Sequence, residues 1–307
     1  MFGVVITTHN RCALLRRCID GLLRQDAPVD RIVVVDNASA DDTSLLFKKD
    51  GAFFGDRRID YVGLETNSGG AGGFHTGIAH AMERGCDWIL VMDDDAYPES
   101  NAVTRLMAVD PEPVAIYAAA AFRDSGDRNE LVWPVVTMED KGRGKMLTRL
   151  DKWEAQVLPV LNAPFIGMLF HRHLIERIGL PDQSFFVSSD DAELCARAWR
   201  FAGGVRLVPS AVVRHPPIAR RWVRLWRWRI SVMELAPWRR YYDTRNRLVV
   251  AKRHFGTRLW TEVLPGTLAR WLVTLAVQPG RLAQSRAFAL GIWDGLTERL
   301  GMRWSPP

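Results

Sequence analysis

The amino-acid sequence predicts an α/β fold with a mostly parallel central sheet and helices on both of its faces. Three runs of apolar residues have the length and composition of strands, at 4–8, 32–35 and 88–92. Between the first two runs, apolar residues recur at helical spacing from Leu14 to Leu23. Continuous apolar strands that alternate with helices are typical of parallel sheets, so we expect this architecture for residues 1–217.

Residues 218–307 are expected to form a separate, mainly helical region. Of the 41 basic residues, 18 lie from Arg214 onward, against only 5 of the 35 acidic residues, and 8 of the 12 tryptophans lie there too. Arginine and tryptophan together are typical of surfaces that meet lipid headgroups, so we expect contact with an anionic membrane surface. Nucleic acid attracts similar charge, but no recognisable nucleic-acid motif is present, and we expect no such partner.

The stretch from Arg220 to Leu235 is predicted to be an amphipathic helix. Its large apolar side chains lie along one helical face and most of its arginines along the other. An aromatic stripe is more often packed in a core than against a membrane, but the density of arginine with tryptophan favours an interfacial surface. The apolar positions are Trp222, Val223, Trp226, Ile230 and Met233.

Cysteine usage and the apolar runs bear on location. The four cysteines form no C-x-x-C pair, so we expect neither a disulfide framework nor a cysteine metal cluster. This usage of cysteine fits a protein of a reducing compartment. No signal peptide precedes the first strand, and the apolar run at 260–277 is interrupted by Glu262, Pro265 and Arg270. We therefore expect a cytoplasmic protein, peripheral on the inner face of the membrane.

Polar residues follow each of the expected strands. Residues 7–11 follow the first strand, Asp36 and Asn37 follow the second, and 93–95 follow the third. In parallel sheets ligands bind at the carboxyl ends of strands, so these residues should share one cleft. A helix cap or a turn is an equally good explanation of Asp36 and Asn37.

A glycine-rich run at 67–77 precedes an expected helix at 78–84. Glycines there allow close backbone approach to a phosphate or a sugar, and a flexible loop is the alternative. The spacing matches neither the dinucleotide-binding fingerprint nor a P-loop, which disfavours a nicotinamide-binding domain. Farther along, the section from Pro111 to Val160, with glycines, prolines and charges around 123–128 and 139–145, is expected to hold a loop.

Three consecutive carboxylates, Asp93, Asp94 and Asp95, end the third strand. They repel one another, and a divalent cation relieves that repulsion; hard oxygen ligands suit Mg²⁺ or Mn²⁺. The alternative is a solvated acidic turn. The buried strand before the carboxylates and the Pro98 stop after them favour the metal.

A second acidic group, Asp190, Asp191 and Glu193, opens a helix expected to run through Arg200. Capping accounts for one carboxylate on a first helical turn, but not for three. His215 follows an apolar run that ends at 213. A lone histidine is more often structural than a ligand, yet at a strand end near an acidic cluster metal ligation becomes competitive.

These motifs, in this order, resemble the family 2, inverting glycosyltransferases of the GT-A fold. The resemblance covers roughly residues 3–250, and among these enzymes the sequence is most similar to the actinobacterial galactofuranosyltransferases that initiate cell-wall galactan. The motifs are Thr-Thr-His-Asn at 7–10, Val-Val-Asp-Asn-Ala-Ser at 34–39, Asn-Ser-Gly-Gly-Ala-Gly-Gly-Phe at 67–74, Met-Asp-Asp-Asp at 92–95, Ser-Ser-Asp-Asp-Ala-Glu at 188–193, His215, and Tyr-Tyr-Asp-Thr-Arg-Asn at 241–246.

The resemblance implies a binding site for a UDP-sugar donor and a divalent metal, Mn²⁺ or Mg²⁺. The metal ligands it implies are Asp93, Asp95 and His215. The residues expected to contact the nucleotide-sugar are Thr7, Asp36, Asn37, Asn67, Gly73, Asp93 and Asp94.

The resemblance also implies the catalytic groups. Asp191 matches the base that takes the proton of the acceptor hydroxyl, with Asp190 as the competitor, and one displacement inverts the anomeric centre. Arg245 and Asn246 either reach the acceptor diphosphate or brace the fold.

The resulting hypothesis is transfer of galactofuranose from UDP-galactofuranose to a polyprenyl-diphosphate-linked glycan in cell-wall polysaccharide synthesis. The alternatives are a rhamnosyltransferase that uses dTDP-rhamnose, a metal-dependent nucleotide-sugar hydrolase, and a non-catalytic glycan-binding module. The acceptor, the linkage, the oligomeric state and the metal used in the cell stay open.

Overall fold

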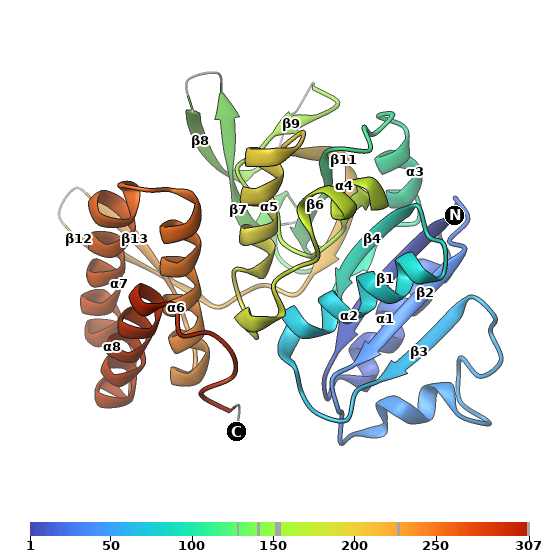
Figure 1. The fold of residues 1–307 in the computed structure, drawn as a ribbon, viewed down its shortest axis with the longest axis horizontal. Helices are drawn as coiled ribbons and strands as arrows, with labels where there is room; N and C mark the ends of the chain where they lie inside the picture. Colours follow the sequence, from blue (N-terminus) through green and yellow to red (C-terminus); the bar gives the residue numbers. More distant parts are fainter. Residues whose placement is uncertain (128, 140–141, 151–154, 226–227, 306–307) are drawn as a thin grey trace. The chain divides into compact units, whose positions relative to one another are not determined.

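The computed structural model describes residues 1–127, 129–139, 142–150, 155–225 and 228–305 (Figure 1). The chain divides into two compact units. The first comprises Met1–Gln183 and Asp191–Pro217, and the second comprises Ser184–Asp190 and Ile218–Pro307. The short segment that precedes Asp191 in the chain is therefore part of the second unit.

The first unit is built on one mixed sheet in which most strands run in the same direction. Its strand order is β3-β2-β1-β4-β10-β6-β11-β5. Strands β3, β2, β1 and β4 pair in parallel, β10 is antiparallel to both β4 and β6, and β11 is parallel to β6. β4 and β11 thus point the same way and end at the same edge of the sheet. The bounds are β1 (Phe2–Thr8), β2 (Arg31–Asp36), β3 (Ile59–Gly63), β4 (Trp88–Asp93), β5 (Tyr97–Pro98), β6 (Ile116–Arg123), β10 (Met168–His171) and β11 (Val205–His215).

Helices cover both faces of this sheet, as the sequence predicts. Side chains alternate between the two faces along a strand. Ile6 of β1 packs with Leu15 of α1 on one face, and Val5 packs with Ile78 of α2 on the other. The helices of this unit are α1 (Cys12–Leu23), η1 (Asp42–Phe47), α2 (Gly69–Glu83), α3 (Ala102–Met107), α4 (Arg172–Ile178) and α5 (Asp190–Phe201). The boundary between the two units along the chain falls within a further short helix, η2 (Gln183–Phe185).

The glycine-rich run forms the first turns of α2 rather than a loop. The helix begins at Gly69, whereas the prediction had it begin at residue 78. A Cβ atom on Gly73 would lie 2.5 Å from Thr7 Cγ2, and one on Gly77 would lie 2.4 Å from Val5 Cγ1. These distances are shorter than any van der Waals contact. Glycine is needed here because it lets the helix lie directly on β1.

The section from Pro111 to Val160 was expected to hold a loop, and residues 124–127 do lie between strands, but most of the section is strand. β7 (Glu130–Glu139) and β8 (Gly142–Arg149) form an antiparallel pair, and β6 runs to Arg123. Leu131, Val132 and Val135 of β7 are buried, and this apolar face explains the pairing. A two-residue strand, β9 (Leu158–Pro159), pairs with β11. Residues 128, 140 and 141 lie outside the described residues.

The second unit combines a β-hairpin with helices. α6 (Pro237–His254) packs along α8 (Arg281–Thr297), and α7 (Leu264–Val277) continues from η3 (Leu259–Val263), a single turn of π-helix. A Cβ on Gly291 of α8 would lie 2.9 Å from the Tyr241 carbonyl oxygen, so glycine permits the close helix packing. No helix in the described part of the chain is both long and apolar enough to cross a membrane.

The prediction of an amphipathic helix at 220–235 is wrong. β12 (Arg220–Leu225) and β13 (Trp228–Met233) form an antiparallel hairpin, and residues 226 and 227 lie outside the described part. Aromatic and β-branched side chains, which the stretch has in abundance, favour strands. The helical spacing of its tryptophans was therefore a coincidence of composition.

Candidate functional site

Three expected metal ligands converge at the carboxyl edge of the first unit's sheet. Asp93 ends β4, Asp95 follows it, and His215 ends β11. One ligand atom from each residue lies within 4.8 Å of the others. The convergence follows from the topology, because β4 and β11 run in the same direction and end at the same edge.

The orientation of His215 suits a metal ligand. Its Nδ1 lies 2.6 Å from the carbonyl oxygen of Pro216, to which it donates, and its Nε2 lies 3.0 Å from Asp95 Oδ1. A backbone carbonyl on one ring nitrogen orients the ring so that the other nitrogen faces Asp95. Asp95 Oδ1 is buried, and its contact with the His215 ring is not a hydrogen bond of suitable geometry. Two carboxylates and one imidazole arranged in this way fit Mg²⁺ or Mn²⁺.

The charge balance at this edge also favours a cation. Burial, and then the neighbouring carboxylates of Asp95 and Asp94, raise the pKa of Asp93 well above its usual value. Burial alone would lower the pKa of His215, but contact with Asp95 outweighs it and the pKa is raised. Arg11 pairs directly with Asp94 and Asp95, and His215 pairs with Asp95, so the protein sets one arginine and one histidine against three adjacent carboxylates.

Asp94 is not one of the three converging ligands. Its Oδ2 accepts from Thr8 Oγ1 at 2.7 Å and its Oδ1 accepts from Arg11 Nη1 at 2.9 Å, and the residue is 3 % exposed. Arg11 also donates to Asp95 Oδ2 at 2.8 Å. The sequence analysis did not single out Arg11, although it follows the first strand at the edge where a cation was expected. Asp94 and Arg11 together tie β4 to the end of β1.

Asp36 and Asn37, at the end of β2, are buried and satisfied within the protein. Asp36 accepts from the Tyr61 hydroxyl at 2.7 Å and from the Ser39 N–H at 2.9 Å. Asn37 Oδ1 accepts from Ser68 Oγ at 2.7 Å. Such contacts are typical of a turn, which was the alternative to ligand binding in the sequence analysis. Nucleotide contact by this pair stays a prediction.

Thr7, Asn37 and Gly73 lie together next to the carboxyl ends of β1 and β2. A Cβ on Gly73 would lie 2.7 Å from both Thr7 Oγ1 and Asn37 Nδ2, and Thr7 Oγ1 is buried without a hydrogen-bond partner. Asn67 Oδ1 accepts from the Gly69 N–H at 2.8 Å and holds the start of α2. Four of the expected nucleotide-sugar residues are thus grouped around one helix start.

The second acidic group opens α5, as expected. Asp190 is buried and Asp191 is half-buried. Burial raises the pKa of Asp191 to about 6, against the lowering effect of the Ala192 N–H, which donates to its Oδ1 at 2.6 Å. Glu193 has a different role, because its carboxylate binds Arg197 at 2.8 Å and Arg197 in turn donates to the carbonyl oxygen of Leu180. An aspartate that titrates near neutral pH is suited to act as a base.

The backbone that enters α5 is held in an unusual conformation. Phe186, Ser188 and Ser189 have φ angles of 66°, 70° and 65°, a left-handed region that side chains other than glycine rarely adopt. Such conformations persist only where the surroundings impose them, and they cluster at functional sites. Asp190 and Asp191 follow directly in the chain.

Arg245 and Asn246 of α6 impose this conformation from within the second unit. Asn246 Nδ2 lies 3.0, 2.8 and 2.7 Å from the carbonyl oxygens of Phe185, Val187 and Ser188. Arg245 donates to Phe185 O at 2.8 Å, and its Nε donates to Asn246 Oδ1 at 2.8 Å. Both residues are 0 % exposed. Of the two roles the sequence left open for them, bracing fits these contacts, and contact with the acceptor stays a prediction.

Asn246→Ala should therefore destabilise the second unit and slow the reaction. It leaves buried carbonyls without a donor, at a cost of about 1–3 kcal/mol for each group left unsatisfied. We expect a lower midpoint in urea unfolding and a reduced kcat, because the chain before Asp191 is no longer held. Asn101→Ala, which removes a side chain that makes no capping bond to α3, is the matched control. Unchanged stability of the Asn246 variant would rule out the bracing role.

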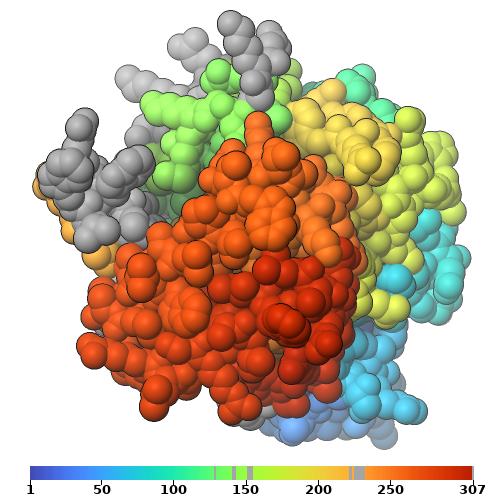
Figure 2. Space-filling model, turned by 60° about the vertical axis from the view of Figure 1, so that its left-hand side comes forward, coloured from blue at the N-terminus to red at the C-terminus, as the bar shows by residue number. Residues whose placement is uncertain are grey.

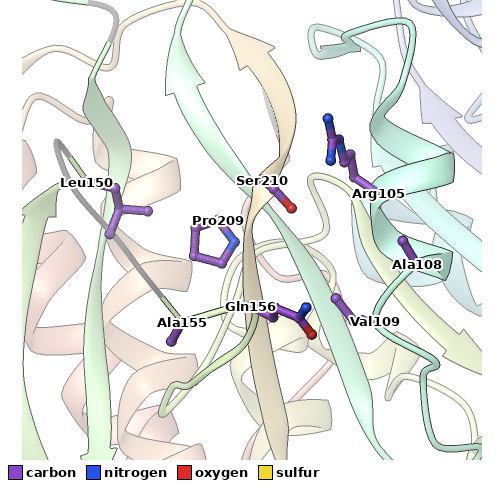
Figure 3. Close-up of a pocket in the computed structure, with 8 residues that line it drawn as sticks. All are labelled: Arg105, Ala108, Val109, Leu150, Ala155, Gln156, Pro209 and Ser210. Atoms are coloured by element: carbon purple, nitrogen blue, oxygen red, sulfur yellow. The ribbon is translucent and has the colours of Figure 1, made fainter.

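A separate cavity of about 420 Å³ lies elsewhere in the first unit (Figure 3). None of the expected metal, nucleotide-sugar or catalytic residues is among those that line it. Its lining residues are Arg105, Ala108, Val109, Leu150, Ala155, Gln156, Pro209 and Ser210.

Comparison with curated proteins finds glycosyltransferases. The galactofuranosyltransferase GlfT1 of Mycolicibacterium smegmatis is 29% identical over 205 residues, which cover 64% of this chain and 64% of that protein. The one of Mycobacterium tuberculosis is 28% identical over 217 residues and 70% of each chain. The dTDP-rhamnosyl transferase RfbF of Shigella flexneri is 23% identical over 299 residues, 96% of this chain and 95% of that protein.

Solved structures share the fold at low sequence identity. TarS of S. aureus superposes with a TM-score of 0.59 at 15% identity and covers 97% of this chain and 49% of that one. The mannosyltransferase PcManGT of Pyrobaculum calidifontis, solved with GDP-Man and Mn²⁺, has a TM-score of 0.59 at 15% identity and covers 97% of this chain and 87% of that one. These similarities show the GT-A fold.

The family model described as glycosyl transferase family 2 matches residues 3–178, which is more than half of the chain and includes the strands β1 to β4 that carry Asp36 and Asp93. The chain therefore belongs to glycosyl transferase family 2.

Proposed function

We propose that the protein is a metal-dependent, inverting galactofuranosyltransferase. It moves galactofuranose from UDP-galactofuranose to a polyprenyl-diphosphate-linked glycan in cell-wall polysaccharide synthesis, at the cytoplasmic face of an anionic membrane. The observation that carries the proposal is the convergence of Asp93, Asp95 and His215 at the strand ends of a family 2 fold. The identity with two galactofuranosyltransferases supports the choice of sugar.

In the proposed reaction, Asp93, Asp95 and His215 would hold Mg²⁺ or Mn²⁺. The metal supplies positive charge that neutralises the diphosphate leaving group. Thr7, Asn37 and Gly73 would position the nucleotide-sugar, with Asp36, Asn67 and Asp94 shaping the same edge. These last three act through the loops and strand ends to which they are hydrogen-bonded.

Asp191 is the proposed base, with Asp190 as the alternative. Its carboxylate takes the proton of the acceptor hydroxyl while that oxygen forms its bond to the anomeric carbon and the bond to the diphosphate breaks. Because attack and departure occur on opposite sides of the carbon, the anomeric configuration inverts. No covalent bond between the sugar and the protein is needed.

The proposal is tested by turnover with two donors and a polyprenyl-diphosphate-linked acceptor, followed by mass spectrometry of the lipid product. We expect addition of a hexose from UDP-galactofuranose and no deoxyhexose from dTDP-rhamnose. Rhamnose is the second candidate because RfbF aligns over nearly the full length of both chains. Donor cleavage at an equal rate without acceptor would instead identify a nucleotide-sugar hydrolase.

The pH dependence of kcat should report the base. With the pKa of Asp191 raised to about 6, the carboxylate is protonated below that pH and cannot accept the acceptor's proton. We expect kcat to rise about tenfold per pH unit below pH 6 and to level off above pH 7. Rates with saturating donor, acceptor and metal between pH 5 and pH 8 would measure this. A kcat that stays constant down to pH 5 contradicts the assignment of Asp191.

A further inference from the structure

Helix α7 presents apolar residues to the outside, whereas two of its three buried residues are threonines. Of its residues, the exposed ones are Pro265, Leu268, Leu272 and Ala276. The buried ones are Thr267, Val273 and Thr274. Leu268 and Leu272 are 44 % and 70 % exposed. A helix that meets water carries polar residues on its outer face, so this outer face is not adapted to water.

The inner side of α7 carries polar groups that are bonded within the protein. Thr267 Oγ1 donates to the Val263 carbonyl oxygen at 2.7 Å and accepts from Arg270 Nη2 at 2.8 Å. Burial, together with Arg247 and Arg240, lowers the pKa of Arg270 to about 9. These groups would be better solvated on the outside, so their inward placement needs a reason on the other face of the helix.

The outer face continues beyond α7. Trp260 of η3 is 60 % exposed, and Ala276, near the end of α7, is exposed as well. We call the four exposed apolar residues Trp260, Leu268, Leu272 and Ala276 the apolar stripe. It belongs to the orange part of the second unit's surface in Figure 2. Leu282, at the start of α8, is 89 % exposed.

The charge of the second unit indicates what meets this stripe. From Ile218 onward the sequence has 17 basic and 5 acidic residues. Arg258 lies just before the stripe and Arg281 just after it, and both are exposed. An apolar helix face flanked by arginines is the pattern of helices that lie in the headgroup layer of an anionic bilayer, with tryptophan at the interface.

We infer that the apolar stripe of α7 is the surface on which the protein docks to an anionic lipid bilayer. This inference rests on the proposed function in one respect, namely that the acceptor is lipid-linked. It differs from the expectation drawn from the sequence, which placed the membrane contact at 220–235. The stripe inserts its leucines among the acyl chains while arginines at both ends meet the phosphates.

The test is cosedimentation of the full chain with vesicles, without donor or acceptor. The vesicles are phosphatidylcholine alone or mixed with phosphatidylglycerol. We expect binding to the mixed vesicles, and a partition coefficient about tenfold lower for the double variant Leu268→Asn, Leu272→Asn. The control, Leu45→Asn with Phe54→Asn, removes equally exposed apolar residues from the first unit and should bind like the wild type.

Three results would overturn the inference. The wild type fails to bind the mixed vesicles, the double variant binds as well as the wild type, or sedimentation shows a wild-type dimer that the double variant converts to a monomer. The last result would mean that a second copy of the chain covers the stripe. A short-chain, detergent-soluble acceptor separates this question from catalysis, because the double variant should use it at the wild-type rate even if vesicle binding is lost.

Discussion

Asp191→Asn should lower kcat by about 10²- to 10⁴-fold, the usual contribution of a general base. The substitution keeps the size of the side chain and its hydrogen-bond acceptor for the Ala192 N–H, but removes the group that takes the proton. Donor affinity should stay the same, because the base acts on the acceptor. Single-turnover rates and calorimetric donor binding on the same protein measure the two effects separately.

The stability of this variant provides an internal control. The pKa of Asp191 is raised from 3.8 to about 6 in the folded protein, so the folded state favours the protonated form. The contribution of this group to stability therefore falls as pH rises from about 4 to 6 and stays low above that range. At pH 7 the asparagine variant should unfold at the same temperature as the wild type or a higher one. Asp190→Asn tests the competitor, and a larger kcat loss there would transfer the role of base to Asp190.

Asp95→Asn should weaken metal binding and, with it, transfer. Replacing one of two carboxylates removes a charged ligand, and metal-derived stabilisation of a leaving group is worth several kcal/mol, or about 10²- to 10³-fold in kcat/KM. We expect the Mn²⁺ concentration at half-maximal rate to rise in the variant, and high Mn²⁺ to restore part of the activity. Titration of the rate with Mn²⁺ measures both.

Asp94→Asn is the matched control for the metal experiment. Its carboxylate is adjacent in sequence and more deeply buried, and it is bound to Thr8 and Arg11 rather than to the converging ligands. This variant should lose stability while its half-maximal Mn²⁺ concentration stays close to that of the wild type. If Asp94→Asn shifts the Mn²⁺ requirement as much as Asp95→Asn does, the set of ligands is wrong.

Much of the first unit is predictable from sequence because its signals are local. Continuous apolar runs identify β1, β2 and β4, and polar residues at strand ends must meet at one edge of a parallel sheet. The prediction grouped His215 with Asp93 and Asp95 through the family resemblance. His215 is far from the two aspartates in the sequence, so no local pattern connects them. The geometry brings all three together, and their metal role stays a prediction.

The features that the sequence did not predict depend on distant partners. Whether a glycine run is a loop or a tightly packed helix depends on what lies beneath it, here Thr7 and Val5. The sequence of the 220–233 stretch is compatible with a helix and with two strands. The antiparallel pairing of β12 with β13 makes it a hairpin. Asn246 is far in sequence from the carbonyl groups it holds, so a polar residue on a helix gave no sign of that role.

Calorimetric donor binding tests the central claim most directly. UDP-galactofuranose and dTDP-rhamnose are titrated into the protein with Mn²⁺ and again after chelation. The account expects UDP-galactofuranose to bind in the presence of Mn²⁺, to lose most of its affinity on chelation, and to outcompete dTDP-rhamnose. Tighter binding of dTDP-rhamnose would contradict the proposed donor, and affinity that chelation leaves unchanged would contradict the metal site formed by Asp93, Asp95 and His215.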